Sequence, residues 1–270
     1  MNTERDLEYW YADPTGNITL LIEGSFSPDV FPGIARLLLS AEPRAEQAGF
    51  LASLTGSTVS LRMAGDEFCG NASLSSAAVA LRCSGASSGC FSVNVFGQAS
   101  PLQAEVQQTG DSCYSGRIEM PAPLDIASRV FSRSGQEFLF PVVRFPGISH
   151  ILSTQPLEKG FAEDAIRSWC RELDAPALGI MQLDLQTDRL LPLVYVPRLD
   201  TLYWESSCAS GTCAAACWFS AANRTEGLFR FTQPGGTLGA QTDHGNLYLS
   251  GTVSLEKKRF SLPAEMPKPL

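Results

Sequence analysis

Two similar motifs, one in each half of the chain, constrain the fold more than any other feature of the sequence. Cys69-Gly70-Asn71-Ala72 precedes an alanine-rich helical pattern, and Cys208-Ala209-Ser210-Gly211 precedes another. The two cysteines lie 208 − 69 = 139 positions apart in a chain of 270 residues. A length of about 1.8 domains, at roughly 150 residues per domain, agrees with two halves. A cysteine followed by tiny residues at a helix start, once in each half, predicts an internal repeat of a site.

Strand-like runs with a few helices between them fill the first half, and the same kind of pattern repeats in the second. Helical spacing of apolar residues predicts helices over Phe31–Leu39, Ala72–Arg82, Ala162–Glu172 and Thr212–Asn223. Runs edged by Gly, Pro or Ser predict strands over Ile18–Ile22, Ser57–Arg62, Phe91–Phe96, Gly116–Met120 and Leu190–Val196, and Gln233-Pro234-Gly235-Gly236 predicts a turn. Pro121-Ala122-Pro123-Leu124 indicates a stop and a hinge. We therefore expect domains at 1–122 and 123–255, with a tail at 256–270 that could pack back on the first half.

Charge and composition argue against several kinds of partner. The chain has 20 basic and 28 acidic residues, a net charge of −8, and only Glu256-Lys257-Lys258-Arg259 is locally basic, so nucleic acid and anionic membranes are poor partners. The longest apolar stretches, such as Ala77–Leu81, are far shorter than a membrane span. No apolar export region follows the polar start Met1–Asp6, so we expect a cytoplasmic protein whose eight cysteines are thiols.

The two repeated cysteines have a chemical use in common. A thiol at a helix N-terminus lies at the positive end of the helix dipole, which lowers its pKa, and we expect this of Cys69 and Cys208. The tiny residues after each cysteine leave backbone N–H groups open to an anion such as a carboxylate. Two such half-sites face to face would hold an amino acid with a thiol on either side of its α-carbon. One thiolate could take the α-proton while the other thiol protonates the opposite face, with no metal and no pyridoxal cofactor.

The other cysteines and the histidines have a simpler interpretation. Free cysteine is usually buried, so we expect the remaining six to pack in the core: Cys83, Cys90, Cys113, Cys170, Cys213 and Cys217. No zinc site is expected, because there is no paired Cys-x-x-Cys motif and both histidines lie far from Cys208 in the sequence. His150 is interpreted as a hydrogen-bonded structural residue, since two proton carriers are already present.

Five segments carry a resemblance to a known family. They are Pro14-Thr15-Gly16-Asn17, Glu46-Gln47-Ala48-Gly49-Phe50, Gly65-Asp66-Glu67-Phe68-Cys69-Gly70-Asn71-Ala72, Trp204-Glu205-Ser206-Ser207-Cys208-Ala209-Ser210-Gly211-Thr212 and Gln233-Pro234-Gly235-Gly236. They occur in family order and cover nearly the whole chain. The chain resembles the diaminopimelate epimerase-like family of cofactor-independent, two-cysteine amino-acid racemases, and within it the histidine racemases of metallophore biosynthesis.

The resemblance implies a fold and a set of site residues. The fold would be α/β (α+β), with two similar domains, each a mostly antiparallel sheet wrapped around a central helix, and the active site in the cleft between them. Cys69 and Cys208 match the two acid/base cysteines. The positions that match contacts to the α-amino and α-carboxyl groups are Asn17, Gly70, Asn71, Glu205, Ala209 and Ser210. Ala209 replaces the usual Gly, which narrows the anion pocket slightly. Family members are often homodimers, so a homodimer is possible here.

Departures from the diaminopimelate epimerases bear on the substrate. Ser206 stands where those enzymes usually have the Arg that holds a distal carboxylate, Met63-Ala64-Gly65-Asp66 is a shortened lead-in, and Gly147-Ile148-Ser149-His150 replaces Gly-Asn-Pro-His. A distal carboxylate buried without its charge partner would cost several kcal/mol, roughly. Histidine or another polar, non-acidic amino acid is favoured, and Glu46 could receive an imidazole or a cation. Two alternatives are an isomerase of diaminopimelate or a hydroxyproline-like imino acid, and a non-catalytic amino-acid-binding protein.

Overall fold

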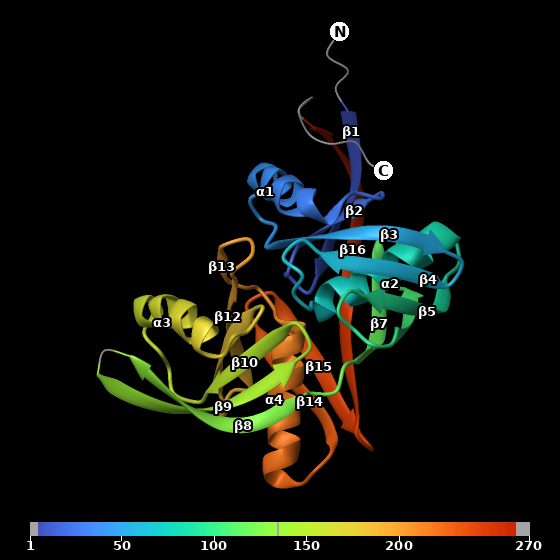
Figure 1. The fold of residues 1–270 in the computed structure, drawn as a ribbon. Helices are drawn as coiled ribbons and strands as arrows, with labels where there is room; N and C mark the ends of the chain where they lie inside the picture. The colour runs from blue at the N-terminus through green and yellow to red at the C-terminus, as the bar shows by residue number, and fades with distance from the viewer. Residues whose placement is uncertain (1–4, 134, 263–270) are drawn as a thin grey trace. The chain divides into compact units, whose positions relative to one another are not determined.

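Strands dominate the structure, which is a computed structural model and describes residues 5–133 and 135–262 (Figure 1). The helices are α1 (Phe31–Ala41), α2 (Gly70–Ser84), α3 (Lys159–Glu172) and α4 (Ala209–Asn223), with a short 3-10 helix at Pro28–Val30. All four predicted helices are therefore confirmed, each somewhat longer than its apolar pattern. The mixed α/β class that the resemblance implies is also confirmed.

The strands follow the predicted runs and add several others. In the first half they are β1 (Arg5–Pro14), β2 (Thr19–Glu23), β3 (Gln47–Thr55), β4 (Thr58–Met63), β5 (Ser88–Val95), β6 (Leu102–Gln108) and β7 (Cys113–Met120). In the second half they are β8 (Asp125–Arg133), β9 (Gln136–Phe145), β10 (Ile148–Ser153), β11 (Leu178–Asp184), β12 (Arg189–Val196), β13 (Thr201–Trp204), β14 (Gly227–Gln233), β15 (Gly236–Asp243) and β16 (Asn246–Leu262). Strand β7 ends just before Pro121, and the predicted turn joins β14 to β15.

The chain divides into two compact units that are discontinuous in sequence. The first unit takes the chain up to Gly65, Asn71–Ile118 and the chain from Gly251 onward, and the second takes Asp66–Gly70 and Glu119–Ser250. The five-residue segment Asp66–Gly70 contains Cys69. This cysteine therefore groups with the same unit as Cys208, although the residues on both sides of the segment belong to the first unit.

The two units repeat one order of strand pairing. In the first, β1 pairs antiparallel with β2, β2 parallel with β3, β3 antiparallel with β4, and β4 parallel with β5. In the second, the same order runs through β9, β10, β11, β12 and β14. Parallel neighbours need a crossover connection, and helices α1 and α2 supply it in the first unit as α3 and α4 do in the second. Each of the two repeated cysteines precedes the second crossover helix of its repeat.

Both of these second crossover helices are buried, and burial explains their composition. Every residue from 71 to 81 of α2 is buried, and so is every residue from 209 to 217 of α4. A helix covered on all sides has no solvent face, and its side chains must be small where strands approach it. A Cβ on Gly116 of β7 would lie 2.8 Å from the Leu74 side chain of α2. Helix α4 packs against β9, β10, β11, β14 and β15, and Figure 1 shows it in orange beside these strands.

The first crossover helix of the second unit packs differently, through a large aromatic side chain. Trp169 of α3 is fully buried, with its ring 5.1 Å from that of Phe131 and 5.7 Å from that of Phe140. These rings belong to one core cluster with Ile166 and Leu193. An amphipathic helix on the face of a sheet thus buries its apolar side, as the helical pattern around Trp169 predicts.

The two ends of the described chain lie side by side in the first unit. Strand β16 pairs antiparallel with β1 from Arg5 opposite Leu262 to Pro14 opposite Val253. Residues 256–262 of the predicted tail therefore lie on β1, and residues 263–270 lie outside the described residues. No helix within 5–133 or 135–262 is long and apolar enough to cross a membrane.

Replacing Trp169 with Ala should destabilise the second unit strongly. Loss of a fully buried indole leaves a cavity among Phe131 and Phe140, at a cost of about 3–5 kcal/mol in the free energy of unfolding. Urea denaturation of Trp169→Ala beside wild type measures this cost. Trp218→Ala, which removes a half-buried indole on α4, is the matched control and should cost less than half as much. Equal losses would contradict the assignment of Trp169 to the core.

Candidate active site

Cys208 caps the N-terminus of helix α4. Its Sγ accepts a hydrogen bond from Gly211 N at 3.4 Å and lies 3.7 Å from Ser210 Oγ. The backbone here is tight, since a Cβ on Gly211 would collide with the Met181 side chain. The first N–H groups of a helix have no acceptor within it, so the amides of Ala209 and Ser210 are available to an anion at this end.

A glutamine at the end of β14 fixes the backbone of this cap. Gln233 Oε1 accepts from Cys208 N at 2.8 Å, and its Nε2 donates to Thr212 Oγ1 at 2.8 Å. Thr212 Oγ1 in turn donates to the carbonyl of Cys208 at 2.7 Å. Gln233 is buried. One side chain therefore holds both the cysteine and the first turn of α4, which fixes the direction of the thiol.

His150 of β10 supports the same cap through Ser210, the second residue of α4. Its Nε2 lies 2.9 Å from Ser210 Oγ, and the ring has no exposed surface. Its Nδ1 has no hydrogen-bond partner among the described residues, and a Cβ on Gly179 would collide with it. Burial lowers the pKa of His150 to about 3, so the ring is neutral at physiological pH. The expected hydrogen-bonded role of His150 is confirmed, and its partner is Ser210.

The thiol pKa of Cys208 differs from the sequence-based expectation. Burial and then the charge of Glu205 raise the pKa of Cys208 well above its usual range, and the hydrogen bonds from Gly211 and Ser210 oppose this only in part. The expected lowering by the helix dipole is therefore wrong for this cysteine, because loss of water outweighs the dipole at a buried cap. The charge of Cys69 raises the pKa of Cys208 further, so the two sulfurs interact electrostatically.

Cys69 belongs to the second unit because it lies in the segment Asp66–Gly70. A Cβ on Gly70 would lie 3.0 Å from Cβ of Ala209, so the residues that follow the two cysteines are in contact. The same position would meet the Met120 side chain at 2.7 Å, which explains why a glycine stands there. Cys69 and Cys208 are both buried. The structure thus brings together Cys69, Gly70, Glu205, Cys208, Ala209 and Ser210.

The other predicted site residues form a polar cluster in the first unit. Asn17 Oδ1 accepts from Gln47 Nε2 at 2.5 Å and from Asn71 Nδ2 at 2.9 Å, and Asn17 Nδ2 donates to the Glu46 carboxylate. Asn17 and Asn71 are buried, whereas Glu46 is partly exposed. Gln47 also donates to Thr19 Oγ1 at 2.8 Å. The amides therefore hold Glu46 at the edge of a rigid network.

The expectation that the other six cysteines pack in the core is half right. Cys170, Cys213 and Cys217 are buried, whereas Cys83, Cys90 and Cys113 are exposed. Cys83 lies in the last turn of α2, where the helix reaches solvent from Arg82 onward. Cys90 lies on the opposite face of β5 from the buried Phe91, as the alternation of a strand requires. Composition alone does not separate these outward positions from core positions.

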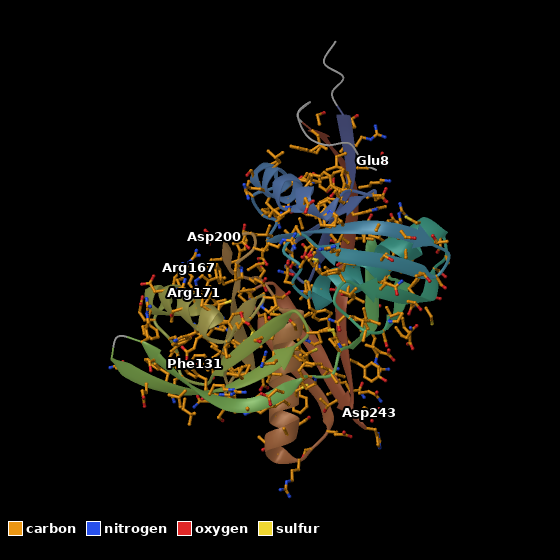
Figure 2. All side chains as sticks on the ribbon, viewed as in Figure 1. Glu8, Phe131, Arg167, Arg171, Asp200 and Asp243 are labelled. Carbon is orange, nitrogen blue, oxygen red and sulfur yellow. The ribbon has the colours of Figure 1, made fainter. Side chains whose placement is uncertain are left out.

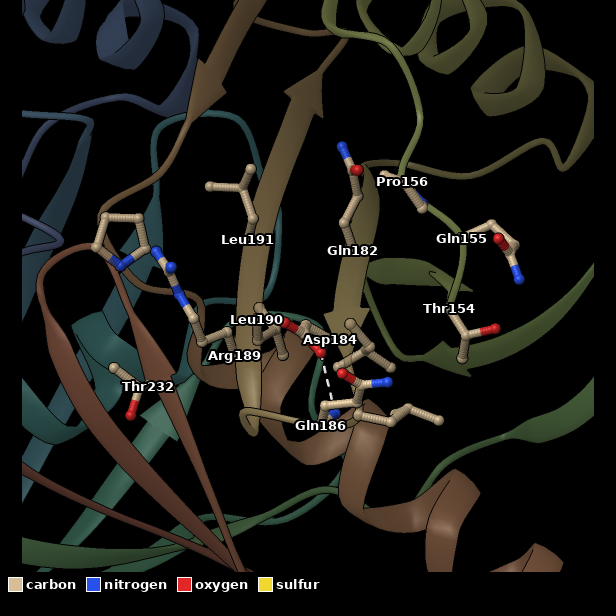
Figure 3. Close-up of a pocket in the computed structure, with 13 residues that line it drawn as sticks. Thr154, Gln155, Pro156, Gln182, Asp184, Gln186, Arg189, Leu190, Leu191 and Thr232 are labelled. Atoms are coloured by element: carbon tan, nitrogen blue, oxygen red, sulfur yellow. Dashed lines mark hydrogen bonds between the residues drawn. The ribbon is translucent and has the colours of Figure 1, made fainter.

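Two further features lie outside this group of residues. A pocket of about 640 Å³ opens beside β11 and β12, lined by Gln182, Asp184, Arg189 and Leu191 among others, and none of the predicted site residues lines it (Figure 3). Glu226, Asp243 and His244 are described residues that could hold a metal ion, with donor atoms within 4.8 Å of one another. Their cluster is largely exposed and contains no predicted site residue.

Sequence reasoning missed the role of Gln233, which it interpreted only as the start of a turn. For His150 it predicted a hydrogen-bonded structural role but not the partner. A signal existed for Gln233, because an N-cap cysteine leaves its own N–H in need of an acceptor and Gln233 begins the nearby glycine-rich turn. The contact between His150 and Ser210 depends on a separation of 60 positions along the chain, which no local pattern reveals.

The repeated fold has close structural relatives. It matches a predicted epimerase from Pseudomonas aeruginosa with a TM-score of 0.68 at 14% identity, over 95% of this chain and 99% of that chain. Identity this low shows a common fold.

The particular family follows from the sequence. The family model for the N-terminal domain of the histidine racemase CntK matches residues 6–258, and the chain belongs to this family. A curated histidine racemase of Fusobacterium nucleatum is 29% identical over 92% of this chain and 94% of its own length. A curated histidine racemase of Staphylococcus aureus is 26% identical over 86% of this chain and 87% of its own length. These relatives define the class of protein, and the chain is an isomerase. The resemblance inferred from the motifs is confirmed.

Stability should depend on pH through His150. Its pKa is about 3 in the folded protein and near 6.5 in the unfolded chain, so only the unfolded chain binds a proton between these values. The free energy of unfolding should fall as pH drops below about 6.5, by up to roughly 1.4 kcal/mol per pH unit. Urea denaturation between about pH 5 and pH 7.5 should show this slope in wild type and a flatter one in His150→Gln.

His244 provides the matched control for this prediction. It is the only other histidine in the sequence, it is exposed, and its hydrogen bond to Asp243 raises its pKa. His244→Gln should therefore keep the loss of stability at low pH. A slope that flattens in His244→Gln and persists in His150→Gln would refute the assignment.

Proposed function

We propose that this isomerase is a histidine racemase that interconverts L- and D-histidine by a two-base mechanism without a cofactor. Cys69 and Cys208 are the two proton carriers. The observation that carries the proposal is that both cysteines belong to one unit, each immediately before a buried helix, with Gly70 and Ala209 in contact directly after them. An α-carbon between the two sulfurs would meet a thiol on each face.

The protonation states of the pair support this chemistry. Two-base inversion needs one thiolate and one thiol at the start of each turnover. Burial and Glu205 favour the protonated form of Cys208, and the mutual effect of the two sulfurs disfavours a doubly ionised pair. We therefore assign Cys208 as the thiol of the resting enzyme and Cys69 as the base. In this state Cys69 takes the α-proton and Cys208 protonates the opposite face.

The reaction then balances without any added reagent. The Cα–H bond of one enantiomer breaks and its proton passes to the Cys69 thiolate. The Cys208 S–H bond breaks and its proton forms a new Cα–H bond on the opposite face. The product leaves with inverted configuration, and the enzyme is left with the protonation of its two sulfurs exchanged, ready for the reverse direction.

The helix ends supply the electrostatic part of catalysis. Loss of the α-proton places negative charge on the substrate's carboxylate, and backbone N–H groups at a helix start stabilise such charge. Ala209 and Ser210 contribute amides from α4, and Gly70 and Asn71 hold the corresponding places at α2. Glu205 lies near enough to act on the Cys208 thiol, and we assign it to the substrate's α-ammonium group.

Histidine is the proposed substrate for two reasons. The curated relatives that cover most of this chain are named histidine racemases. The Glu46 carboxylate is held by Asn17 in a partly exposed position, where it could accept a hydrogen bond from an imidazole. Ser206 in place of an arginine leaves a distal carboxylate without a charge partner, which argues against diaminopimelate.

Purified protein should exchange the α-proton of L-histidine in deuterated buffer and form D-histidine. Protein treated with EDTA and given no pyridoxal phosphate should keep its full rate, because only the two thiols carry protons. Proton NMR follows the exchange, and chiral chromatography follows the product. Diaminopimelate and hydroxyproline serve as competing substrates. Exchange with neither histidine nor these amino acids would refute the proposal, and a clear preference for another substrate would reassign it.

Cys69→Ser and Cys208→Ser should each lose racemisation by about 100- to 10,000-fold, because a hydroxyl is a far weaker acid than a thiol and a poor base at neutral pH. Initial rates from both enantiomers measure the loss. Cys213→Ser is the matched control, since Cys213 is a buried thiol on the same helix five positions after Cys208. It should remain active once folded. Full activity in either Cys69→Ser or Cys208→Ser would exclude the two-base assignment.

A further inference from the structure

Arg198 makes a contact that the proposed mechanism does not use. This residue lies in the turn between β12 and β13, and its guanidinium forms an ion pair with Asp66. Asp66 is the first residue of the segment Asp66–Gly70, three positions before Cys69. Both partners of the ion pair belong to the second unit. The pair therefore ties the lead-in to Cys69 to a turn in the unit that contains Cys208.

The turn that carries Arg198 is itself well fixed. Leu199 N donates to Val196 O at 3.2 Å, and Asp200 N donates to Pro197 O at 3.1 Å. Asp200 at its end forms an ion pair with Arg167 of helix α3, and Figure 2 labels both side chains. A guanidinium that starts from such a turn has a defined position, so it can act as an anchor for a neighbouring segment.

The Asp66 end of the contact also has a defined geometry. Asp66 has φ of +61°, in the left-handed region that Asp and Asn tolerate better than most residues. Beyond it, the segment packs closely on the second unit, because a Cβ on Gly147 would lie 2.9 Å from Phe68 N and one on Gly70 would lie 3.0 Å from Ala209 Cβ. The ion pair thus holds the first residue of a segment whose last residue contacts α4.

We propose that Arg198 and Asp66 are positioning residues that hold Cys69 against the second unit in the geometry required for proton transfer. The inference rests on the proposed function in that Cys69 is taken as a proton carrier. Neither residue is among those assigned above to the substrate. Transfer between a sulfur and an α-carbon requires close alignment, and a misplacement of about 1 Å can cost on the order of 100-fold in rate. Partly exposed ion pairs add little to global stability, so the loss should appear in kcat and not in unfolding.

The experiment has a structural arm that needs no activity. Hydrogen–deuterium exchange of wild type and Arg198→Ala should show faster exchange at residues 66–70 in the variant, with the rest of the second unit unchanged. Arg167→Ala is the matched control, because it removes the other ion pair of the same turn, which Asp200 and not Asp66 accepts. Unchanged exchange at residues 66–70 in Arg198→Ala, or equal acceleration in Arg167→Ala, would overturn the proposal.

The kinetic arm separates positioning from a general structural effect. Arg198→Ala and Asp66→Asn should each lower kcat for racemisation about 10- to 100-fold, with KM within about twofold of wild type. The double variant should lose no more than either single variant, because both remove one interaction. Arg198→Lys, which keeps the charge, should recover part of kcat, and Arg167→Ala should retain it.

The two arms distinguish failure of the positioning role from failure of the proposed function. Wild-type kcat in Arg198→Ala, or losses that multiply in the double variant, would refute the positioning role even if wild type racemises histidine. Wild type that exchanges no α-proton, together with faster hydrogen exchange of residues 66–70 in Arg198→Ala, would refute the proposed function and keep the anchoring of this segment.

Discussion

The burial of one helix in each repeat is the constraint on which the rest of the structure depends. Helices α2 and α4 are covered over most of their length, so they cannot carry an amphipathic pattern and are built largely from Ala, Ser, Gly and Cys. Such a helix has a fixed axis, because strands contact it on several sides. Its N-terminus is therefore a rigid point, and a residue placed there, such as Cys208, inherits that rigidity. The two-base racemisation proposed above needs this property, since it must hold two proton carriers in place through every turnover.

Much of the fold could be predicted because its signals are local. The four helices carry their pattern within about three turns, and the two cysteine motifs are short and alike. Other features depend on residues far apart in sequence. Strand β1 pairs with β16 across the whole length of the chain, and neither strand indicates its partner. The polar cluster around Asn17 needs Asn71, which is 54 positions away. Periodicity predicts that elements exist, but not which distant elements meet.

The prediction for the Cys208 pKa failed for an instructive reason. The helix dipole and the Gly211 N–H do favour a thiolate, as the position at a helix start indicates, but these effects act on a sulfur that is already out of water. Desolvation opposes ionisation more strongly than a single helix end favours it. Sequence reveals the helix start, whereas burial is a property of the packed unit. The charge of Glu205, three residues earlier, adds to burial with the same sign.

This outcome suits an enzyme that works in both directions. If both thiols had low pKa values, both would ionise and neither could donate a proton. Burial at Cys208 and the repulsion between two nearby thiolates disfavour a doubly ionised pair, so in the proposed mechanism one of the two sulfurs always keeps a proton to donate. The cost is that the thiolate must be formed and used in a site that disfavours charge. In the proposed mechanism the helix ends at Gly70 and Ala209 offset this cost, because they would stabilise negative charge on the substrate as the α-proton leaves. Tight support of Cys208 by Gln233 and Ser210, and of the Cys69 segment by its own contacts, is then what the proposed mechanism requires of a buried pair of thiols that must transfer protons without water to carry them.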